Sequence, residues 1–456
     1  MRATSLREIA DAVGGTADAD ATVTGVVIDS RRVSQGDLFV ALPGERVDGH
    51  DYAAAAVADG AAAVLAARPL DVPCVVVDDP AAALGRLACW YNATLPARVV
   101  GITGSTGKTS TKDLVAQVVE TAGETIAPVG SFNNELGLPL TVLRADDTTD
   151  FLVLEMSARG TGHIAWLCDV AAPDIGVVLN VGVAHLGEFG SQEAIARAKG
   201  ELVEATNGLV VLNADDPLVM GMRTRTTKPV VTFGSDGDYR AESVVLDELS
   251  RASFDLVTPD GRAEVRLGLV GEHHVSNALA TAAVGAWAGL SPDAIAAALS
   301  KATPRSRWRM EVRETPGGVT VINDAYNANP DSMRAALKTL AAAGRSGRRT
   351  WAVLGEMAEL GDAAWDAHDD IGRLCVRLDV NRLVVVGENA KGIHAGAGLE
   401  GSWGNETAYV EDADAAIRLL VDELSPGDVV LVKASRAAGL ERVALALTPD
   451  PEEATT

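Results

Sequence analysis

Cysteine is scarce in this chain of 456 residues, which has four of them, at positions 74, 89, 168 and 375. None belongs to a Cys-x-x-Cys pair or has the spacing of a zinc finger, and this excludes a sulfur-based metal centre of that kind. Cysteines at this density do not form a disulfide framework either. We therefore expect the protein to work in a reducing compartment.

Long apolar runs are missing as well. No uncharged apolar stretch reaches the roughly 18 residues of a membrane span, and the N-terminal segment MRATSLREIADAVGG lacks the apolar core of a signal peptide. Basic residues are outnumbered, with 39 Lys and Arg against 63 Asp and Glu, for a net charge of −24. That sign argues against nucleic acid or an anionic membrane as a partner, but leaves room for a local basic pocket. We expect a cytoplasmic location.

The sequence does contain a regular alternation of strand-like and helical runs, and 47% of its residues are hydrophobic, enough for several buried cores. We predict an α/β protein of three domains. They are a small N-terminal α/β domain (1–97), a central P-loop domain with a parallel sheet (98–304), and a C-terminal Rossmann-like domain (305–456). Such alternation predicts parallel sheets with helices on both faces. Residues 240–269 alternate differently and predict a small antiparallel addition.

A glycine-rich segment, GITGSTGKTSTK, follows the β-branched run RVVGIT and precedes a helical run. It departs from the usual Gly-x-x-x-x-Gly-Lys-[Ser/Thr] pattern, because Gly104 stands only three residues before Gly107. The segment can still bind phosphate in the way such loops do, because glycines let the backbone curl and successive amides at the helix start can face an anion. Lys108 can then reach phosphates and Thr109 can ligate Mg²⁺. We predict an ATP-phosphate site formed by Gly104, Ser105, Thr106, Gly107, Lys108, Thr109 and Ser110.

Other polar residues follow later strands. Glu155 ends the run FLVLEM, where the carboxyl ends of parallel strands face a ligand crevice, and a carboxylate there suits Mg²⁺. The alternative is an edge carboxylate with no ligand. His185 should emerge at the same rim, although a lone histidine is more often structural. Nothing local separates Lys199 from a surface lysine, and Asn277 in isolation indicates little.

Several segments together resemble the Mur ligase family. They are GSTGKTSTK, NNELGLPLT, LEMSARGTGHI, AHLGEFGSQEAIARAKGEL, LNADDP, GEHHVSNALA and DAYNANPDSM, in this order. The similarity covers nearly the whole chain, and the shortened glycine loop is the form found in that superfamily. Residues 155–164 and 324–333 point to the member that adds D-alanyl-D-alanine. The sibling that adds diaminopimelate typically has an Asp-Asn-Pro-Arg motif, which is missing here.

The resemblance implies an enzyme that joins UDP-MurNAc-tripeptide to D-alanyl-D-alanine and converts ATP to ADP and phosphate. An acyl phosphate would be the intermediate, and the product would be the UDP-MurNAc-pentapeptide of peptidoglycan synthesis. The third residue of the tripeptide stays open between lysine, diaminopimelate and an amidated form. The resemblance also implies two Mg²⁺ sites, one of them through Lys199 carbamylated by CO₂.

Residue roles follow from the same resemblance. It implies that the metal ligands are Thr109, Glu155, His185 and Lys199. The catalytic residues would be Lys108, Glu155, His185, Lys199 and Arg309, with Arg309 reaching the γ-phosphate. Asn277 would contact adenine, and Asp324 and Tyr326 would hold the nucleoside.

For the substrates, the resemblance points to three places. The uridine segment would contain Asp29, Ser30 and Arg31, the loop over the muramyl peptide Asn133 and Asn134, and the nucleotide or dipeptide surface Asn327 and Asn329. One departure concerns VKASR at residues 432–436, where the family has Val-Lys-Gly-Ser-Arg. Because Ala434 replaces the glycine, the roles of Lys433 and Ser435 are implied only weakly.

Two other functions are weighed against this one. Folylpolyglutamate synthetase or another amide ligase of the superfamily would share the glycine loop but should lack DSRR near residue 30. A nucleotide-sensing module without turnover would leave Glu155, His185 and Lys199 without a task. Three domains joined by short hinges suit a closure that excludes water, so we expect a C-terminal domain that is mobile without ligand, in a monomer.

Overall fold

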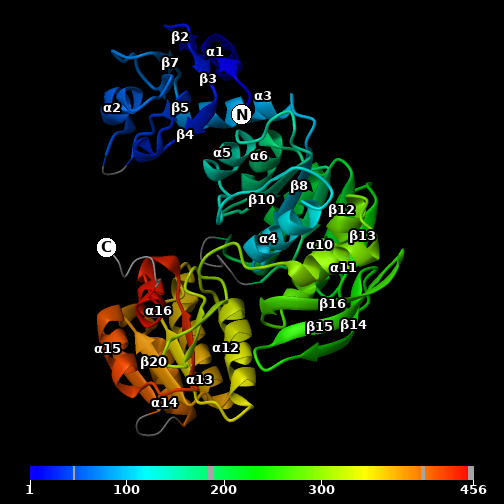
Figure 1. Cartoon of the computed structure of the whole chain (residues 1–456), viewed down its shortest axis with the longest axis vertical. Helices are drawn as coiled ribbons and strands as arrows, with labels where there is room; N and C mark the ends of the chain where they lie inside the picture. Colours follow the sequence, from blue (N-terminus) through cyan, green and yellow to red (C-terminus); the bar gives the residue numbers. More distant parts are fainter. Residues whose placement is uncertain (45–46, 183–188, 402–405, 450–456) are drawn as a thin grey trace.

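The computed structural model describes residues 1–44, 47–182, 189–401 and 406–449. Three α/β units follow one another along the chain, and the N-terminal and C-terminal units flank the central one (Figure 1). The predicted three-domain α/β architecture is confirmed. Among the helices described, none combines the length and the apolar character needed to cross a membrane.

The N-terminal unit is built on a five-stranded sheet of order β2-β7-β6-β5-β4, in which only β2 runs antiparallel to its neighbour. Helix α3 packs against α1 and also against α5 and α6 of the central unit, so it joins the two units. The elements are β1 Thr4–Ser5, α1 Leu6–Val13, β2 Thr16–Ala17, β3 Thr22–Val23, β4 Gly25–Val27, η1 Ser30–Arg32, β5 Asp37–Val40, η2 Gly49–Tyr52, α2 Ala53–Ala58, β6 Ala63–Ala66, β7 Cys74–Val76 and α3 Pro80–Asn92.

The central unit has a six-stranded sheet of order β13-β12-β11-β8-β10-β9, in which every pair is parallel. One face packs against α5, α6 and α8, and the other against α4, α10 and α11. The elements are β8 Arg98–Thr103, α4 Lys108–Val119, β9 Thr125–Ile126, α5 Gly137–Val142, β10 Phe151–Glu155, α6 His163–Val170, β11 Ile175–Val178, α8 Gln192–Ala205, β12 Leu209–Asn213, α9 Pro217–Gly221, η3 Met222–Arg225, β13 Val230–Phe233, α10 His274–Trp287 and α11 Pro292–Lys301.

The antiparallel addition predicted for residues 240–269 is confirmed as a three-stranded sheet of order β14-β15-β16. Its strands are β14 Arg240–Leu246, β15 Arg251–Thr258 and β16 Gly261–Val270. Buried residues alternate with half-buried ones along β15 and with exposed ones along β16, and the buried set packs on the same core as α10 and α11. This sheet therefore has one face on the core and the other toward solvent.

The C-terminal unit has a second six-stranded sheet, of order β17-β18-β22-β19-β20-β21, parallel except for the edge strand β17. The sequence predicted its four central strands and missed the edge strands β17 and β21. The elements are β17 Glu311–Glu314, β18 Thr320–Asn323, α12 Pro330–Gly344, β19 Thr350–Leu354, η4 Gly361–Ala363, α13 Ala364–Arg377, β20 Arg382–Val386, η5 Glu388–Ala390, α14 Lys391–Glu400, β21 Thr407–Val410, α15 Ala413–Glu423, β22 Val429–Lys433, η6 Arg436–Ala438 and α16 Glu441–Leu447.

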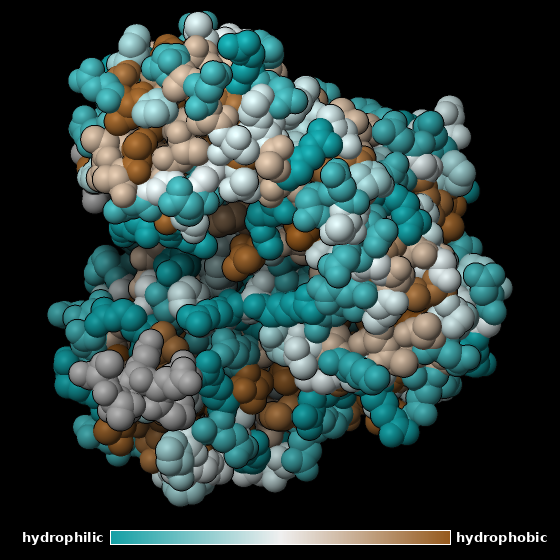
Figure 2. Space-filling view, turned by 45° about the horizontal axis from the view of Figure 1, so that its top comes forward, coloured by the Kyte–Doolittle hydropathy of each residue, from teal (hydrophilic) through white to brown (hydrophobic). Residues whose placement is uncertain are grey.

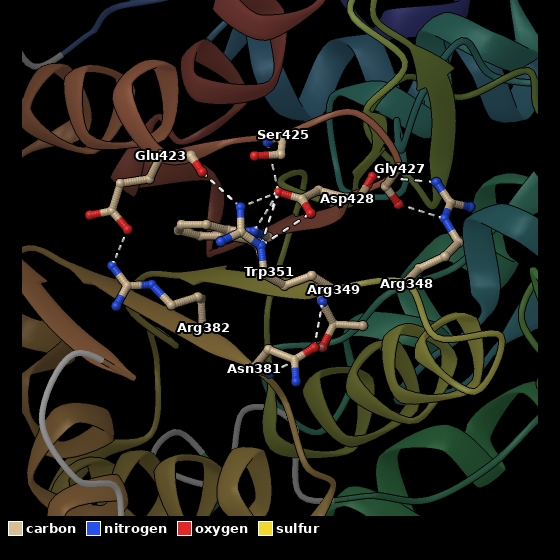
Figure 3. Close-up of polar contacts among 10 residues, drawn as sticks. Arg348, Arg349, Trp351, Asn381, Arg382, Glu423, Ser425, Gly427 and Asp428 are labelled. Atoms are coloured by element: carbon tan, nitrogen blue, oxygen red, sulfur yellow. Dashed lines mark hydrogen bonds and ion pairs between the residues drawn. The ribbon is translucent and has the colours of Figure 1, made fainter.

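A polar network closes the amino ends of these C-terminal strands (Figure 3). The buried Trp351 donates its indole N–H to Asp428 at 3.0 Å, and Arg349 donates to the same carboxylate at 2.6 Å. The guanidinium carbons of Arg349 and Arg382 lie 4.9 and 5.1 Å from the centre of the Trp351 ring. This end of the sheet is tied together by its own side chains, which leaves the opposite, carboxyl end to face a ligand.

Candidate active site

The glycine-rich loop connects β8 to α4, as the sequence predicted, and the helix begins at Lys108. Gly107 has a left-handed φ of 78°, and a Cβ there would lie 2.8 Å from Oδ1 of Asn277, so the position requires glycine. Lys108 Nζ donates to the Gly104 carbonyl oxygen at 2.7 Å. No side chain among the described residues caps α4, and the amides of its first turn are available to an anion.

Two loop amides are occupied by a residue that the sequence analysis missed. Asn180 accepts hydrogen bonds from the amides of Ser105 and Thr106 at 3.0 and 2.9 Å, and it donates to the Thr106 carbonyl at 3.2 Å. These two amides precede the helix start, where the sequence analysis expects successive amides to face an anion. The signal was present in the sequence, because Asn180 follows a strand at the same rim as Glu155.

Glu155 ends β10 beside the start of α4 and is buried. Thr109 donates its hydroxyl to one carboxylate oxygen at 2.8 Å, and the Asn133 amide donates to the other at 2.7 Å. Asn133, which the resemblance placed over the muramyl peptide, thus also fixes the orientation of Glu155. The three side chains place a hydroxyl and a carboxylate together at the helix start.

Lys199 is not a surface lysine, because α8 carries it into the interior, where it is 4% exposed. Burial lowers the pKa of its ammonium well below the ordinary value, and the positive charge of Lys108 adds to that shift. Burial and the charge of Arg309 likewise lower the pKa of Lys108, while Glu155 opposes the change. The described residues offer Lys199 no hydrogen-bond or ion-pair partner. His185 lies outside the described residues.

The C-terminal unit contributes a second set of charged residues. The guanidinium carbon of Arg309 lies 4.3 Å from the centre of the Tyr326 ring, and within the described chain its buried Nε has no partner. Asp324 accepts a hydrogen bond from Lys433 Nζ at 2.6 Å. The hydroxyls of Tyr326 and Ser131 are hydrogen-bonded, which ties this unit to a loop of the central one.

The alanine that departs from the family pattern is accommodated by a glycine opposite it. Ala434 is fully buried, and a Cβ at Gly355 would lie only 2.9 Å from the Ala434 methyl carbon. Ser435 on its far side accepts a hydrogen bond from the Ala358 amide at 2.9 Å and donates to the Ala328 carbonyl at 3.3 Å. Lys433 and Ser435 therefore keep defined positions despite Ala434.

Many of these groups line one cavity of about 580 Å³, whose lining residues come from the central and C-terminal units. Figure 2 shows a hollow across the middle of the molecule with hydrophilic side chains around much of its border. The predicted residues that line the cavity are Ser105, Thr106, Gly107, Lys108, Thr109, Ser110, Asn133, Asn134, Glu155, Asn277, Arg309, Asp324, Tyr326, Asn327, Asn329, Lys433 and Ser435. Lining residues that the sequence analysis missed include Ser131, Arg159, His163, Asn180, His273 and Arg436. Gly104 and Lys199 are not among the lining residues.

Two of the lining asparagines cap helices as well. Asn329 caps α12 and accepts from the Ser332 amide at 2.9 Å. Asn134 accepts from the Gly137 amide at 2.9 Å at the start of α5. Their amide oxygens are therefore engaged by the protein.

The predicted uridine segment does not reach this cavity. Asp29, Ser30 and Arg31 lie at η1 in the N-terminal unit and are absent from the cavity lining. Hydrogen bonds from the Arg31 side chain and amide lower the pKa of Asp29 to about 2. The structure thus leaves the uridine segment separate from the phosphate loop.

The described residues contain no cluster of three or more His, Cys, Asp or Glu that could hold a metal ion. A magnesium ion at Thr109 and Glu155 would therefore depend on ligands from elsewhere, such as phosphate oxygens and water. The hard oxygen atoms of these two side chains fit that ion, and their hydrogen bond holds them together at the start of α4.

Sequence models of known families match the chain in three consecutive parts. They are described as "Mur ligase family, catalytic domain" over residues 22–91, "Mur ligase middle domain" over 102–285, and "Mur ligase, glutamate ligase domain" over 308–436. The matches therefore fall in all three units of the structure.

Whole-length relatives agree with these matches. The UDP-N-acetylmuramoyl-tripeptide–D-alanyl-D-alanine ligase of Mycobacterium tuberculosis is 54% identical, over 98% of this chain and 98% of its own. The Escherichia coli enzyme of the same name is 36% identical, over 98% and 99%. MurF from Acinetobacter baumannii superimposes with a TM-score of 0.88 at 30% identity, over 99% and 100% of the two chains. The Thermotoga maritima MurF ligase in complex with ADP gives 0.80 at 30% identity, over 95% and 99%.

Proposed function

Because the chain belongs to the Mur ligase family, we propose that it uses ATP to add D-alanyl-D-alanine to UDP-MurNAc-tripeptide, giving UDP-MurNAc-pentapeptide for peptidoglycan synthesis. Whole-length relatives with this activity in their names support the choice of substrates. The observation that carries it in the structure is the cavity in which Lys108 and Glu155 of one unit face Arg309 and Asp324 of another. A nucleotide-sensing module would not need that second unit at the phosphate loop.

The reaction has to make an amide from a carboxylate and an amine, which is unfavourable in water. In the first step the terminal carboxylate of the tripeptide attacks the γ-phosphorus of ATP, and the bond to the ADP oxygen breaks. The D-alanyl-D-alanine amine then attacks the acyl carbon, loses a proton and expels inorganic phosphate. Phosphoryl transfer of this type depends mainly on positioning and on neutralising charge.

Lys108 and Arg309 supply that neutralisation from two sides. The amides of the first turn of α4 would receive phosphate oxygens, and Lys108, now bonded to Gly104, would turn its ammonium to them. Arg309 approaches from the C-terminal unit, and its Nε has no hydrogen-bond partner in the part of the chain that the structure describes. Such preorganised donors are typically the largest single contribution to catalysis of charge-developing steps. Asn277, Asp324 and Tyr326 would hold adenine and ribose.

Thr109 and Glu155, with His185, would hold Mg²⁺, which when bound offsets the charge of the phosphates. Asn133 would keep Glu155 in the required orientation through its hydrogen bond. Removing the Asn133 amide should therefore lower the affinity for Mg²⁺ more than the affinity for the muramyl substrate. We include a second Mg²⁺ site, through Lys199, in the proposal.

The environment of Lys199 supports its carbamylation. A lysine with a lowered pKa is partly neutral, and only the neutral amine can attack CO₂. The new N–C bond forms with loss of one proton, and it replaces a buried cation beside Lys108 with an anion. ¹³C NMR after equilibration with labelled bicarbonate should show a protein-bound carbamate in the wild type and none in Lys199→Met.

The uridine end of the substrate would lie on the N-terminal unit at Asp29, Ser30 and Arg31, with Asn133 and Asn134 along the peptide. Asn327 and Asn329 would face nucleotide or dipeptide. We also propose that closure of the C-terminal domain completes the site, that the domain boundaries fall at residues 97/98 and 304/305, and that the protein acts as a monomer in the cytoplasm. Compaction on substrate addition in small-angle scattering would test the closure.

The test of the reaction is phosphate release with ATP, Mg²⁺, UDP-MurNAc-tripeptide and D-alanyl-D-alanine, omitting each component in turn. We expect release to require all four and the nucleotide product to gain the mass of one dipeptide unit. Release with a folate or another amino acid, and none with the muramyl tripeptide, would overturn the proposed substrates. Binding of ATP without release under any condition would overturn the proposed enzyme.

A further inference from the structure

The helix that begins at Lys108 also holds the connection between the central and C-terminal units. Asp113, Gln117 and Glu120 follow one another at spacings of four and three residues, which places them on one face of α4 and its C-terminal end. We call these three residues the linker seat. Each of them bonds to the segment that follows α11.

The contacts of the linker seat are specific and mutual. Gln117 and Thr303 exchange two hydrogen bonds of 3.0 Å, from amide to side-chain oxygen and from side-chain amide to carbonyl. The buried amide of Ser306 donates to Asp113 at 3.0 Å. Both terminal nitrogens of Arg305 donate to Glu120, each at 2.5 Å. Residues 303–306 are thereby fixed to the helix of the phosphate loop.

The next residues of the chain are fixed to the other unit. The Trp308 carbonyl accepts a hydrogen bond from the Tyr326 amide at 3.1 Å, and the Met310 amide donates to Asp324 at 3.1 Å. Between them, Arg309 lies over the Tyr326 ring. Only Arg307 separates the segment held by the central unit from the segment held by the C-terminal unit.

The backbone on both sides of Arg309 is strained. Trp308 and Met310 have φ values of 59° and 49°, in the left-handed region that non-glycine residues rarely adopt. Such conformations persist only when their surroundings enforce them, and they concentrate at functional sites. The bonds at Asp113, Tyr326 and Asp324 supply that enforcement, and Arg309, between the two strained residues, lines the cavity.

We infer that the linker seat is a positioning device that sets Arg309 against Lys108, so that one rigid helix aligns the two cations that meet the γ-phosphate. The inference rests on the proposed function, because it assigns the seat a part in the ATP-dependent step. Asp113, Gln117 and Glu120 act through Arg309 and do not touch the substrate. A displacement of about 1 Å in a reacting group can cost about 10²-fold in rate, so a loosened linker should be costly.

The test uses the double variant Gln117→Ala/Arg305→Ala, which removes the exchanged hydrogen bonds and the ion pair without adding bulk. Arg309→Ala serves as the reference, and Arg442→Ala, which removes an exposed ion pair with Asp414, as the matched control. Affinities for ATP and ADP are measured separately, before any ligation. We expect the double variant to bind ADP as the wild type does and to lose about tenfold in ATP affinity, as Arg309→Ala does. We expect kcat to fall between about tenfold and 100-fold, with KM for the muramyl substrate unchanged.

A charge exchange then separates positioning from folding. Arg305→Glu/Glu120→Arg restores the ion pair with its charges reversed, so it should recover most of the kcat lost in Arg305→Glu alone. Hydrogen exchange of residues 303–306 should be faster in Arg305→Glu and slow again in the exchanged pair. A double variant with wild-type ATP preference and kcat would overturn the inference, and so would a parallel loss of ADP binding and thermal stability.

The nucleotide measurements keep the two proposals apart. If the wild type performs no ligation but the double variant still loses its preference for ATP over ADP, the proposed reaction fails and the linker seat stands. If ligation is normal and insensitive to the seat, the reaction stands and the positioning role fails.

Discussion

The amino ends of the C-terminal strands and the phosphate rim of the central sheet differ in whether their buried charged side chains have partners. At the former, Asp428 is 4% exposed and bonds to Arg349, Trp351 and the Ser425 amide (Figure 3). At the latter, Lys108 and Lys199 have no ion-pair partner within the described residues. An unpaired buried charge costs free energy, and a paired one does so far less.

The difference indicates what each region is for. The network around Asp428 contains its own counter-charges and needs nothing from outside, so its role is to hold the strands together. At the rim, Lys108 and Lys199 lack an ion-pair partner among the described residues, and ATP phosphates or a carbamate would provide the counter-charge. Substitutions should therefore separate stability from catalysis according to the region in which they fall.

Lys199→Met should produce the largest effect on catalysis. The change keeps the length of the side chain and removes the amine that would be carbamylated, so we expect kcat to fall by about 10³-fold, because the second Mg²⁺ site that would offset the transition-state charge is lost. Measured without CO₂, stability should rise by about 1–2 kcal/mol, since the change removes a buried amine that has no partner among the described residues. Denaturant unfolding and the phosphate-release assay measure the two effects. A variant less stable than the wild type would show that this lysine is structurally paired after all.

Asp428→Ala should lower stability and leave catalysis nearly unchanged. It leaves Arg349 and the Trp351 indole without their acceptor, so we expect a loss of about 3 kcal/mol in the free energy of unfolding. At 20 °C the kcat should stay within about twofold of the wild type, because the network lies at the end of the sheet away from the cavity. Arg442→Ala is the control and should cost about 0.5 kcal/mol or less, since its ion pair is exposed. A loss of kcat in folded Asp428→Ala as large as the loss in Lys199→Met would contradict the difference between the two regions.

The same carboxyl predicts a dependence on pH. Burial alone would raise the pKa of Asp428, but the hydrogen bonds from Arg349 and the Ser425 amide outweigh it and leave the pKa below its ordinary value. A lowered pKa contributes stability above the unfolded pKa, near 4, and that contribution is lost as pH falls through the folded pKa. The stability difference between wild type and Asp428→Asn should therefore be full at about pH 6 and shrink toward about pH 3. Urea unfolding across that range measures it, and a constant difference would exclude the charge as its cause.

The sequence was sufficient for the features that depend on local patterns. The phosphate loop, the antiparallel addition and the four central strands of the C-terminal sheet follow from glycine placement and from alternating runs of hydrophobic residues. The edge strands β17 and β21 were missed because they are short and largely half-buried, which weakens the pattern.

The burial of Lys199 could not be predicted from its helix alone. Its lack of partners among the described residues depends on how α8 packs against the rest of the central unit. The residues next to Lys199 in the sequence do not indicate that packing. Asn180 and the linker seat were missed for a related reason. Their partners lie 74 to 193 residues away along the chain, so only the folded structure brings them together.

Ala434→Gly should have the smallest effect on stability and on kcat. It tests how rigid the cavity end of the C-terminal sheet is. The change restores the glycine of the family pattern but empties the space that the methyl group fills against Gly355. We expect a loss of about 1 kcal/mol in stability, from the added backbone freedom and the small void. The kcat should change by less than about twofold, because Asp324 and Asn327 hold Lys433 and the Ala358 amide holds Ser435 whichever residue lies between them. A clear gain in kcat would instead mean that the alanine displaces those side chains, and that this part of the rim is less rigid than its hydrogen bonds indicate.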